Sequence, residues 1–109
     1  MKNYRNLTID IDSSILVLTV SRPQALNALN KETLKELDEA VQEIYETPDI
    51  SGVIITGEGD KAFVAGADIK EFTGLNRDTA LELAATGQRI FRKIEDCPKP
   101  VIAAVNGFA

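Results

Sequence analysis

Apolar side chains recur with two different periods along this chain. In residues 7–11 they occupy every second position, the pattern of a half-buried strand, and a short polar turn leads into an almost wholly apolar run at 15–20. The two runs predict a β-hairpin that ends at Pro23, because proline cannot donate to a strand ladder. Two later runs, 52–57 and 101–105, are apolar at nearly every position and predict strands that are covered on both faces.

The helical period governs the segments between these strands. Residues 31–46 carry apolar side chains three or four positions apart and predict a helix that is capped by Asn30. A longer helix is predicted over 78–95. Its apolar stripe is expected to consist of Leu83, Ala84, Ile90, Phe91 and Ile94. A short helix between them is expected to open with an acidic capping box that starts at Asp68, and to end at Gly74.

The resulting order, β-β-α-β-α-α-β, predicts an α/β fold with a largely parallel sheet that follows a leading hairpin. No linker and no internal repeat divides the chain. Nothing after 101–105 supplies a helix or a neighbouring strand for that last strand. We therefore expect residues 1–109 to form the N-terminal part of a larger single domain. The alternative is that the earlier helices cover 101–105 as a terminal strand.

The composition removes several classes of chemistry. The 109 residues include no histidine, which excludes Ser-His-Asp catalysis, Cys-His catalysis and His-ligated metal sites from this chain. The single cysteine, Cys97, follows a predicted helix C-terminus, where we expect an unreactive thiol. One cysteine allows no internal disulfide and no cysteine-cluster metal site, so a reducing, cytoplasmic location without a bound metal is expected.

The charge balance points away from polyanionic partners. Twelve basic and 17 acidic residues give a formal net charge of -5, which argues against nucleic acid and acidic membrane surfaces as the main partners. No apolar run approaches the roughly 20 residues that a membrane span needs. Four carboxylates lie along one face of the first predicted helix: Glu32, Glu36, Glu39 and Glu43. We interpret this row as a solvated acidic face and not as a metal site.

Residues 62–72 carry the most informative local pattern. They follow a predicted buried strand and open a helix, and the small side chains at 65–67 would let a ligand approach the backbone closely. Amides in such a loop can stabilise a developing oxyanion, and the alternative is a tight turn with small residues for packing. We interpret Asp68 as a helix cap and not as an acid or base. Lys61 and Lys70 either contact an anionic ligand or are solvated surface residues.

Four blocks in this order resemble the N-terminal part of the enoyl-CoA hydratase/isomerase family, the crotonase superfamily. They are SRPQALNAL at 21–29, VIITG at 53–57, AGADI at 65–69 and PKPVIAAVNG at 98–107. The resemblance covers nearly the whole chain and is greatest to bacterial short-chain enoyl-CoA hydratases. It implies a crotonase-like (ClpP/crotonase) spiral of ββα units, of which this chain is the N-terminal portion only.

The resemblance also implies roles for individual residues. In this family the thioester carbonyl is held in an oxyanion hole of two backbone amides, and the first of them corresponds to the amide of Ala67. The residues that would line the CoA and substrate path are Ala25, Leu26, Ala65, Gly66, Asp68 and Ile69. Arg22 or Gln24 would lie near the CoA phosphates.

The activity implied is the addition of water to a trans-2-enoyl-CoA by the parent enzyme. In the family the second amide and the acid–base glutamates follow the Val-Asn-Gly block, past Ala109, so the chain alone is expected to be inactive. The alternatives are another reaction of the superfamily, such as enoyl-CoA isomerisation, and a non-catalytic CoA-binding or interaction fragment. No cofactor is implied, because CoA belongs to the acyl-CoA substrate. The family implies a homo-oligomer, a trimer or a hexamer.

Overall fold

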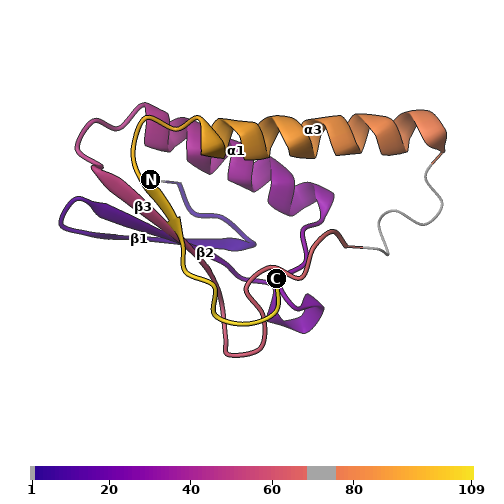
Figure 1. The fold of residues 1–109 in the computed structure, drawn as a ribbon, viewed down its shortest axis with the longest axis horizontal. Coiled ribbons are helices and arrows are strands. Elements are labelled where there is room, and N and C mark those ends of the chain that lie inside the picture. The colour runs from indigo at the N-terminus through magenta and orange to yellow at the C-terminus, as the bar shows by residue number, and fades with distance from the viewer. Residues whose placement is uncertain (1, 69–75) are drawn as a thin grey trace.

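A four-stranded mixed sheet with helices on one side forms the fold (Figure 1). The computed structural model describes residues 2–68 and 76–109. In chain order the elements are β1 (Leu7–Asp12), β2 (Ile15–Val20), the 3-10 helix η1 (Pro23–Ala25), α1 (Lys31–Tyr45), β3 (Gly52–Gly57), α3 (Arg77–Glu95) and β4 (Val101–Ala103). The predicted hairpin, both longer helices and the largely parallel sheet are confirmed. The short helix predicted to end at Gly74 lies outside the described residues.

The strands follow one another across the sheet in the order β1-β2-β3-β4. The hairpin strands β1 and β2 pair antiparallel, with Leu7 opposite Val20, whereas β3 pairs parallel to β2 and β4 parallel to β3. Parallel neighbours need a crossover between them, and α1 and α3 supply the two crossovers. The carboxyl ends of β2, β3 and β4 therefore lie at the same edge of the sheet.

One face of the sheet forms the core with the helices. Leu16, Leu18 and Val20 of β2 are buried and pack with Leu37 and Ile44 of α1. Because successive side chains of a strand point to opposite faces, the residues between them face away from the helices. The core is thus a single layer between the sheet and the helix pair.

The prediction that 52–57 and 101–105 are covered on both faces is wrong for the described part of the chain. Ile54 and Ile102 pair across β3 and β4 on the face that points away from the helices. Ile54 is only half-buried, and Ile102 is 61% exposed. The last strand is also shorter than predicted, because regular pairing ends at Ala103. An apolar run shows that a strand can be buried on both faces and does not show what covers it.

The two long helices begin in the same way. Asn30 Oδ1 accepts a hydrogen bond from Thr33 N, and Asn76 Oδ1 accepts one from Thr79 N, both at 2.8 Å. These caps satisfy amides that have no partner within the helix. The predicted cap at Asn30 is confirmed, and α3 begins at Arg77, one residue earlier than predicted.

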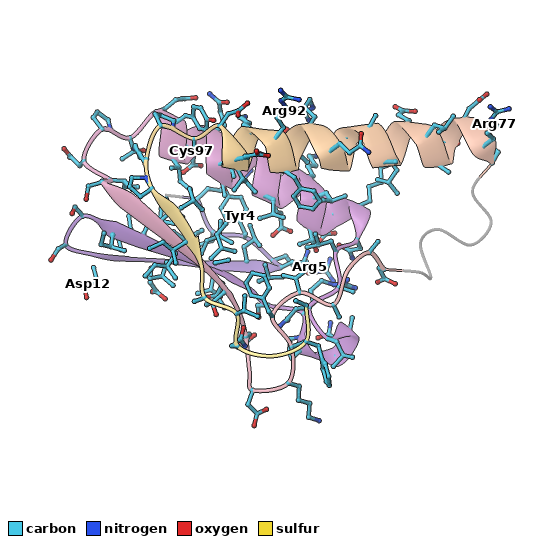
Figure 2. All side chains as sticks on the ribbon, in the orientation of Figure 1. Tyr4, Arg5, Asp12, Arg77, Arg92 and Cys97 are labelled. Atoms are coloured by element: carbon cyan, nitrogen blue, oxygen red, sulfur yellow. The ribbon has the colours of Figure 1, made fainter. Side chains whose placement is uncertain are left out.

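The apolar stripe of α3 differs from the prediction at two positions. Leu83 and Ile94 pack against the core beside the fully buried Ile90, whereas Ala84 and Phe91 are exposed. Each exposed residue follows a core-facing one by a single position, which is about 100° around a helix. Figure 2 shows the opposite side of α3, where Arg92 points away from the rest of the molecule.

The acidic face of α1 is not the solvated face that the sequence predicts. Glu36 is buried and accepts hydrogen bonds from the backbone N and the Nδ2 of Asn6, at 2.8 and 2.9 Å. Tyr4 Oη donates to Glu43 Oε1 at 3.3 Å, and burial followed by the charge of Glu43 raises the pKa of Tyr4 to about 12 (Figure 2). The row of glutamates therefore holds the segment 2–6 against the helix.

Candidate functional site

Two segments from distant parts of the chain lie side by side at the centre of the candidate site. Ala65 N donates to Leu26 O at 3.2 Å, Leu29 N donates to Gly66 O at 2.8 Å, and Asp68 N donates to Leu29 O at 2.9 Å. These bonds form a short parallel pairing that places Leu29 opposite Ala67. The block at 21–29 and the small-residue loop, for which the resemblance implies one shared site, are thus in contact.

The amide of Ala67 is directed away from this pairing. In a parallel bridge, a residue on one strand forms hydrogen bonds with the two neighbours of the residue opposite it. Leu29 is therefore bonded to Gly66 O and Asp68 N, and the backbone N–H and C=O of Ala67 do not take part in the bridge. Within residues 2–68 and 76–109, Ala67 N donates no hydrogen bond. Ala65, Gly66 and Ala67 are all exposed. An exposed amide between two anchored neighbours can donate to a ligand without losing a bond of its own.

Gly66 is needed for its backbone conformation. Its φ is 93°, a value that L side chains rarely adopt, while a Cβ at this position would meet no atom within 4 Å. The positive φ turns the chain immediately before Ala67. The glycine therefore contributes to the direction of the Ala67 amide and does not merely make room for a neighbour.

The bend that follows η1 contains two further residues with positive φ, Leu26 at 53° and Asn27 at 58°. Asn27 is 1% exposed; its Oδ1 accepts from Arg22 N, and its Nδ2 donates to Glu58 O and Ala62 O at 3.1 and 3.0 Å. Asparagine tolerates this conformation, whereas a leucine there is strained. Leu26 is 43% exposed, so its side chain is free to contact a ligand.

Arg22 does not point into solvent, where a phosphate ligand would be expected. Its Nη2 lies 3.1 Å from Asp68 Oδ2, and its Nη1 donates to Ala28 O. The side chains of Arg22 and Asp68 are only 12% and 15% exposed. Of the two residues expected near the CoA phosphates, Gln24 is the exposed one.

The side chain of Asn106 is hydrogen-bonded to the loop that leads to the small residues. Asn106 Oδ1 accepts from Gly57 N at 3.1 Å, and Asn106 Nδ2 donates to Gly57 O and Gly59 O, both at 2.9 Å. A Cβ on Gly107 would overlap the backbone of Lys61, so that position requires a glycine. The predicted Asn-Gly turn is a bend that brings its segment against the entry to the 65–68 loop.

Sequence reasoning missed two contributors to this site. The side-chain amides of Asn27 and Asn106 converge on the carbonyl of Ala62, which no local pattern indicates. The signal that could have found them is the paired asparagines in the first and last blocks, because asparagine both donates and accepts and tolerates a positive φ.

The remaining predicted residues are placed as follows. Ala25 is half-buried in η1, next to the exposed Leu26. Lys61 is exposed and lines a shallow hollow of about 200 Å³ with Pro23 and Leu26. Ile69 and Lys70 lie outside the described residues. Cys97 is a half-buried free thiol.

Residues 2–68 and 76–109 contain no group of three or more cysteine, aspartate or glutamate side chains placed to hold a metal ion. No helix among them is long and apolar enough to cross a lipid bilayer.

Comparison with known sequences identifies relatives over nearly all of the chain. The family model for enoyl-CoA hydratase/isomerase matches residues 10–109. A crotonyl-CoA hydratase from Syntrophomonas wolfei is 50% identical over 106 residues, which cover 97% of this chain and 41% of the relative. A short-chain-enoyl-CoA hydratase from Clostridium acetobutylicum is 46% identical over 104 residues, which cover 95% of this chain and 40% of the relative.

Solved structures share the fold. An enoyl-CoA hydratase from Bacillus anthracis matches with a TM-score of 0.91 and 34% identity, over 94% of this chain and 40% of that one. The enoyl-CoA hydratase of Mycobacterium smegmatis matches with a TM-score of 0.88 and 36% identity. The predicted fold class, the N-terminal part of a crotonase-like fold, is confirmed, and the chain spans about 40% of the length of its curated relatives. This chain belongs to the enoyl-CoA hydratase/isomerase family.

Proposed function

We propose that this chain supplies part of the thioester-binding site of an enoyl-CoA hydratase. The observation that carries the proposal is the amide of the exposed residue Ala67, which has no acceptor within the described ranges and lies between two residues that are hydrogen-bonded to the segment 26–29. A thioester oxygen in front of that amide would accept a hydrogen bond. The names of the relatives from Syntrophomonas wolfei and Clostridium acetobutylicum support a short-chain enoyl-CoA as the substrate.

The chemistry of hydration explains why such an amide matters. Water adds to C3 of a trans-2-enoyl-CoA, and negative charge develops on the thioester oxygen as the enolate forms. A fixed amide directed at that oxygen stabilises the charge without reorganising during the reaction. The proton must be taken from water and returned to C2 by positioned carboxyl groups. Family resemblance places those groups and the second amide after the Asn106–Gly107 bend, so we propose that residues 1–109 alone do not turn over.

The CoA part of the substrate would lie along the bend and the small-residue loop. Leu26, Ala65, Gly66 and Asp68 belong to the hydrogen-bonded segments around Ala67, and Ala25 and Ile69 belong to the same proposal by resemblance. No separate cofactor takes part, because CoA arrives with the acyl group. Lys61, exposed beside Leu26, is the candidate cation for a CoA phosphate.

The remaining proposals concern the whole protein. Exposed apolar side chains such as Leu81, Ile102 and Phe108 support further burial in a homo-oligomer, a trimer or a hexamer by family resemblance. The single cysteine is free, in keeping with a reducing cytoplasmic location. An acyl-CoA is the proposed partner, and nucleic acid and membranes are not.

Replacement of Ala67 by proline tests the proposal, because proline has no amide hydrogen to donate. In the complete polypeptide we expect Ala67→Pro to lower kcat for crotonyl-CoA hydration by about 100- to 1,000-fold, as for other lost oxyanion donors. Ala67→Ser retains the amide and is the matched control, with activity expected within a few-fold of the unsubstituted protein.

Three results would contradict the proposal. Equal loss of activity in both Ala67 variants would show that the amide hydrogen is not the feature that matters. Isomerisation of a 3-enoyl-CoA without hydration would favour the isomerase alternative. Binding of CoA by the complete polypeptide without either reaction would favour the non-catalytic alternative.

A further inference from the structure

The ion pair of Arg22 and Asp68 joins two segments that are 46 positions apart in sequence. It is the most enclosed ion pair of the described residues, since the five others each include a side chain that is 31% or more exposed. Burial of a charged pair carries a desolvation cost that good geometry must offset. We therefore expect this enclosed pair, next to an exposed loop, to have a role that a solvated surface ion pair does not have.

The pair connects both sides of the candidate site. Arg22 Nη1 donates to Ala28 O, in the same segment whose next residue, Leu29, bonds to Gly66 O and Asp68 N. Arg22 Nη2 reaches Asp68 Oδ2, at the other end of the small-residue loop. The guanidinium thus joins the Asp68 side chain, directly after Ala67, to the bend, in addition to the backbone bond from Asp68 N.

The two contacts also restrict what else Arg22 can do. Both terminal nitrogens of its guanidinium group donate within the protein, one to a carbonyl and one to a carboxylate, and the side chain is 12% exposed. A residue that binds a solvent-exposed phosphate would keep its guanidinium accessible. The geometry favours a role in placing the backbone over a role in binding CoA.

We infer that Arg22, acting through Asp68, is a positioning residue that fixes the direction of the Ala67 amide. The inference rests on the proposed function of that amide. Arg22 touches no reacting atom, and its effect is on where the amide hydrogen lies. A misplacement of about 1 Å in a catalytic group can cost about 100-fold in rate. Binding of the CoA part, which uses other contacts, is affected much less.

The experiment compares variants of the pair in the complete polypeptide, with crotonyl-CoA as substrate. We expect Arg22→Met to lower kcat at least tenfold and to change KM less than about threefold, because the lost interaction acts on the transition state. Arg22→Lys keeps a charge for Asp68 but lacks the planar fork, so it should recover only part of kcat. Arg5→Met, which removes an exposed arginine paired with Glu32 at 3.8 Å, is the matched control and should leave both constants unchanged.

A double variant separates positioning from stability. Arg22→Met removes the ion pair from the largely buried carboxylate of Asp68, and the further change Asp68→Asn removes that charge and should recover much of the lost stability. We expect kcat to stay low in this double variant. The red shift in absorbance of a bound dienoyl-CoA, which reports polarisation of its carbonyl, should be smaller than in the unsubstituted protein.

Each contrary outcome has a distinct meaning. Recovery of kcat together with stability in the double variant would overturn the inference and leave a purely structural pair. A raised KM with an unchanged kcat in Arg22→Met would overturn it in favour of phosphate binding. Failure of the unsubstituted protein to bind or hydrate crotonyl-CoA would overturn the proposed function, and the positioning role with it.

Discussion

Two asparagine side chains shape the loop in front of the candidate site. Asn27 and Asn106 lie in the first and the last of the four sequence blocks, and the Nδ2 groups of both donate to Ala62 O. Between them they satisfy backbone groups of Gly57 and Glu58 that would otherwise lack partners where β3 ends. Buried backbone groups without partners are costly, so these two side chains maintain the turn on which the 65–68 loop depends.

Removal of one of these side chains should destabilise the fold measurably. Asn27→Ala removes the hydrogen bonds of Arg22 N and Glu58 O and one of the two to Ala62 O, and it places alanine at a φ of 58°, so we expect a loss of about 2–3 kcal/mol in the free energy of unfolding. Urea denaturation checks this. Asn3→Ala, at an exposed position, is the control and should change stability by less than about 0.5 kcal/mol. An equal effect of the two substitutions would refute the bracing role.

At the residue scale, the sequence indicates which residues belong to the candidate site better than it indicates which residues they contact. The small side chains at 65–67 and the resemblance indicate the Ala67 amide before any coordinates are known. The ion pair of Arg22 and Asp68 has no local signal, because it depends on how a bend after β2 meets a loop after β3. For that reason the resemblance offers Arg22 or Gln24 for the CoA phosphates without indicating that Arg22 lies within the protein.

Polar contacts join α1 to α3 and to the segment that precedes β4. Lys99 Nζ donates to Ile44 O at 2.6 Å and to Thr47 O, which satisfies carbonyls at the C-terminal end of the helix. In the middle of α1, Asp38 accepts from Arg89 and Lys93 of α3. The helix pair is thus held by charge as well as by its apolar contacts.

The contact of Asp38 with Arg89 and Lys93 predicts that the stability of the fold depends on pH. The hydrogen bond from Arg89, followed by that from Lys93, outweighs partial burial and lowers the pKa of Asp38 from its usual 3.8. A carboxyl group with a lowered pKa in the folded state stabilises the fold above its unfolded pKa. That stabilisation is lost as the pH falls through the folded value.

Asp38→Asn should therefore reduce the free energy of unfolding at pH 7 by about 0.5–1 kcal/mol, the size of a partly exposed pair. The difference from the unsubstituted protein should shrink as the pH falls through the lowered folded pKa of Asp38, and disappear once the carboxyl group is protonated. Thermal unfolding from pH 2 to 7 measures this, with Asp49→Asn, an exposed substitution outside the pair, as control. A difference that stays the same from pH 7 down to pH 2 would show that the charge is not its source.

The elements themselves follow from the sequence more closely than their surroundings do. The periods of the apolar positions predict each strand and both long helices to within two residues. They do not predict that Ile102 and Phe91 are exposed, because a local pattern shows how apolar a face is and not whether another part of the protein reaches it. The prediction that the glutamates on α1 face solvent fails for a related reason. A polar face can be covered by other polar residues, and here residues 2–6 cover it.

Considered as a whole, the described part of the molecule is elongated and covered on one side. Its extents are 44 × 29 × 22 Å, and the first half of α3 extends beyond the sheet (Figure 1). The face of the sheet that points away from the helices carries Val17, Ile54 and Ile102 in one row across three strands. This arrangement agrees with a chain that spans about 40% of the length of its curated relatives.

The most direct test of the account is to observe the Ala67 amide while a thioester binds. Butyryl-CoA is added to the ¹⁵N-labelled complete polypeptide, and the amide proton shifts of residues 65–68 are followed by NMR. Hydrogen bonding to the thioester oxygen predicts that the Ala67 proton moves downfield by more than those of Ala65 and Asp68, whose amides are already bonded within the protein. A bound thioester that shifts other residues and leaves the Ala67 proton unchanged would contradict the central claim.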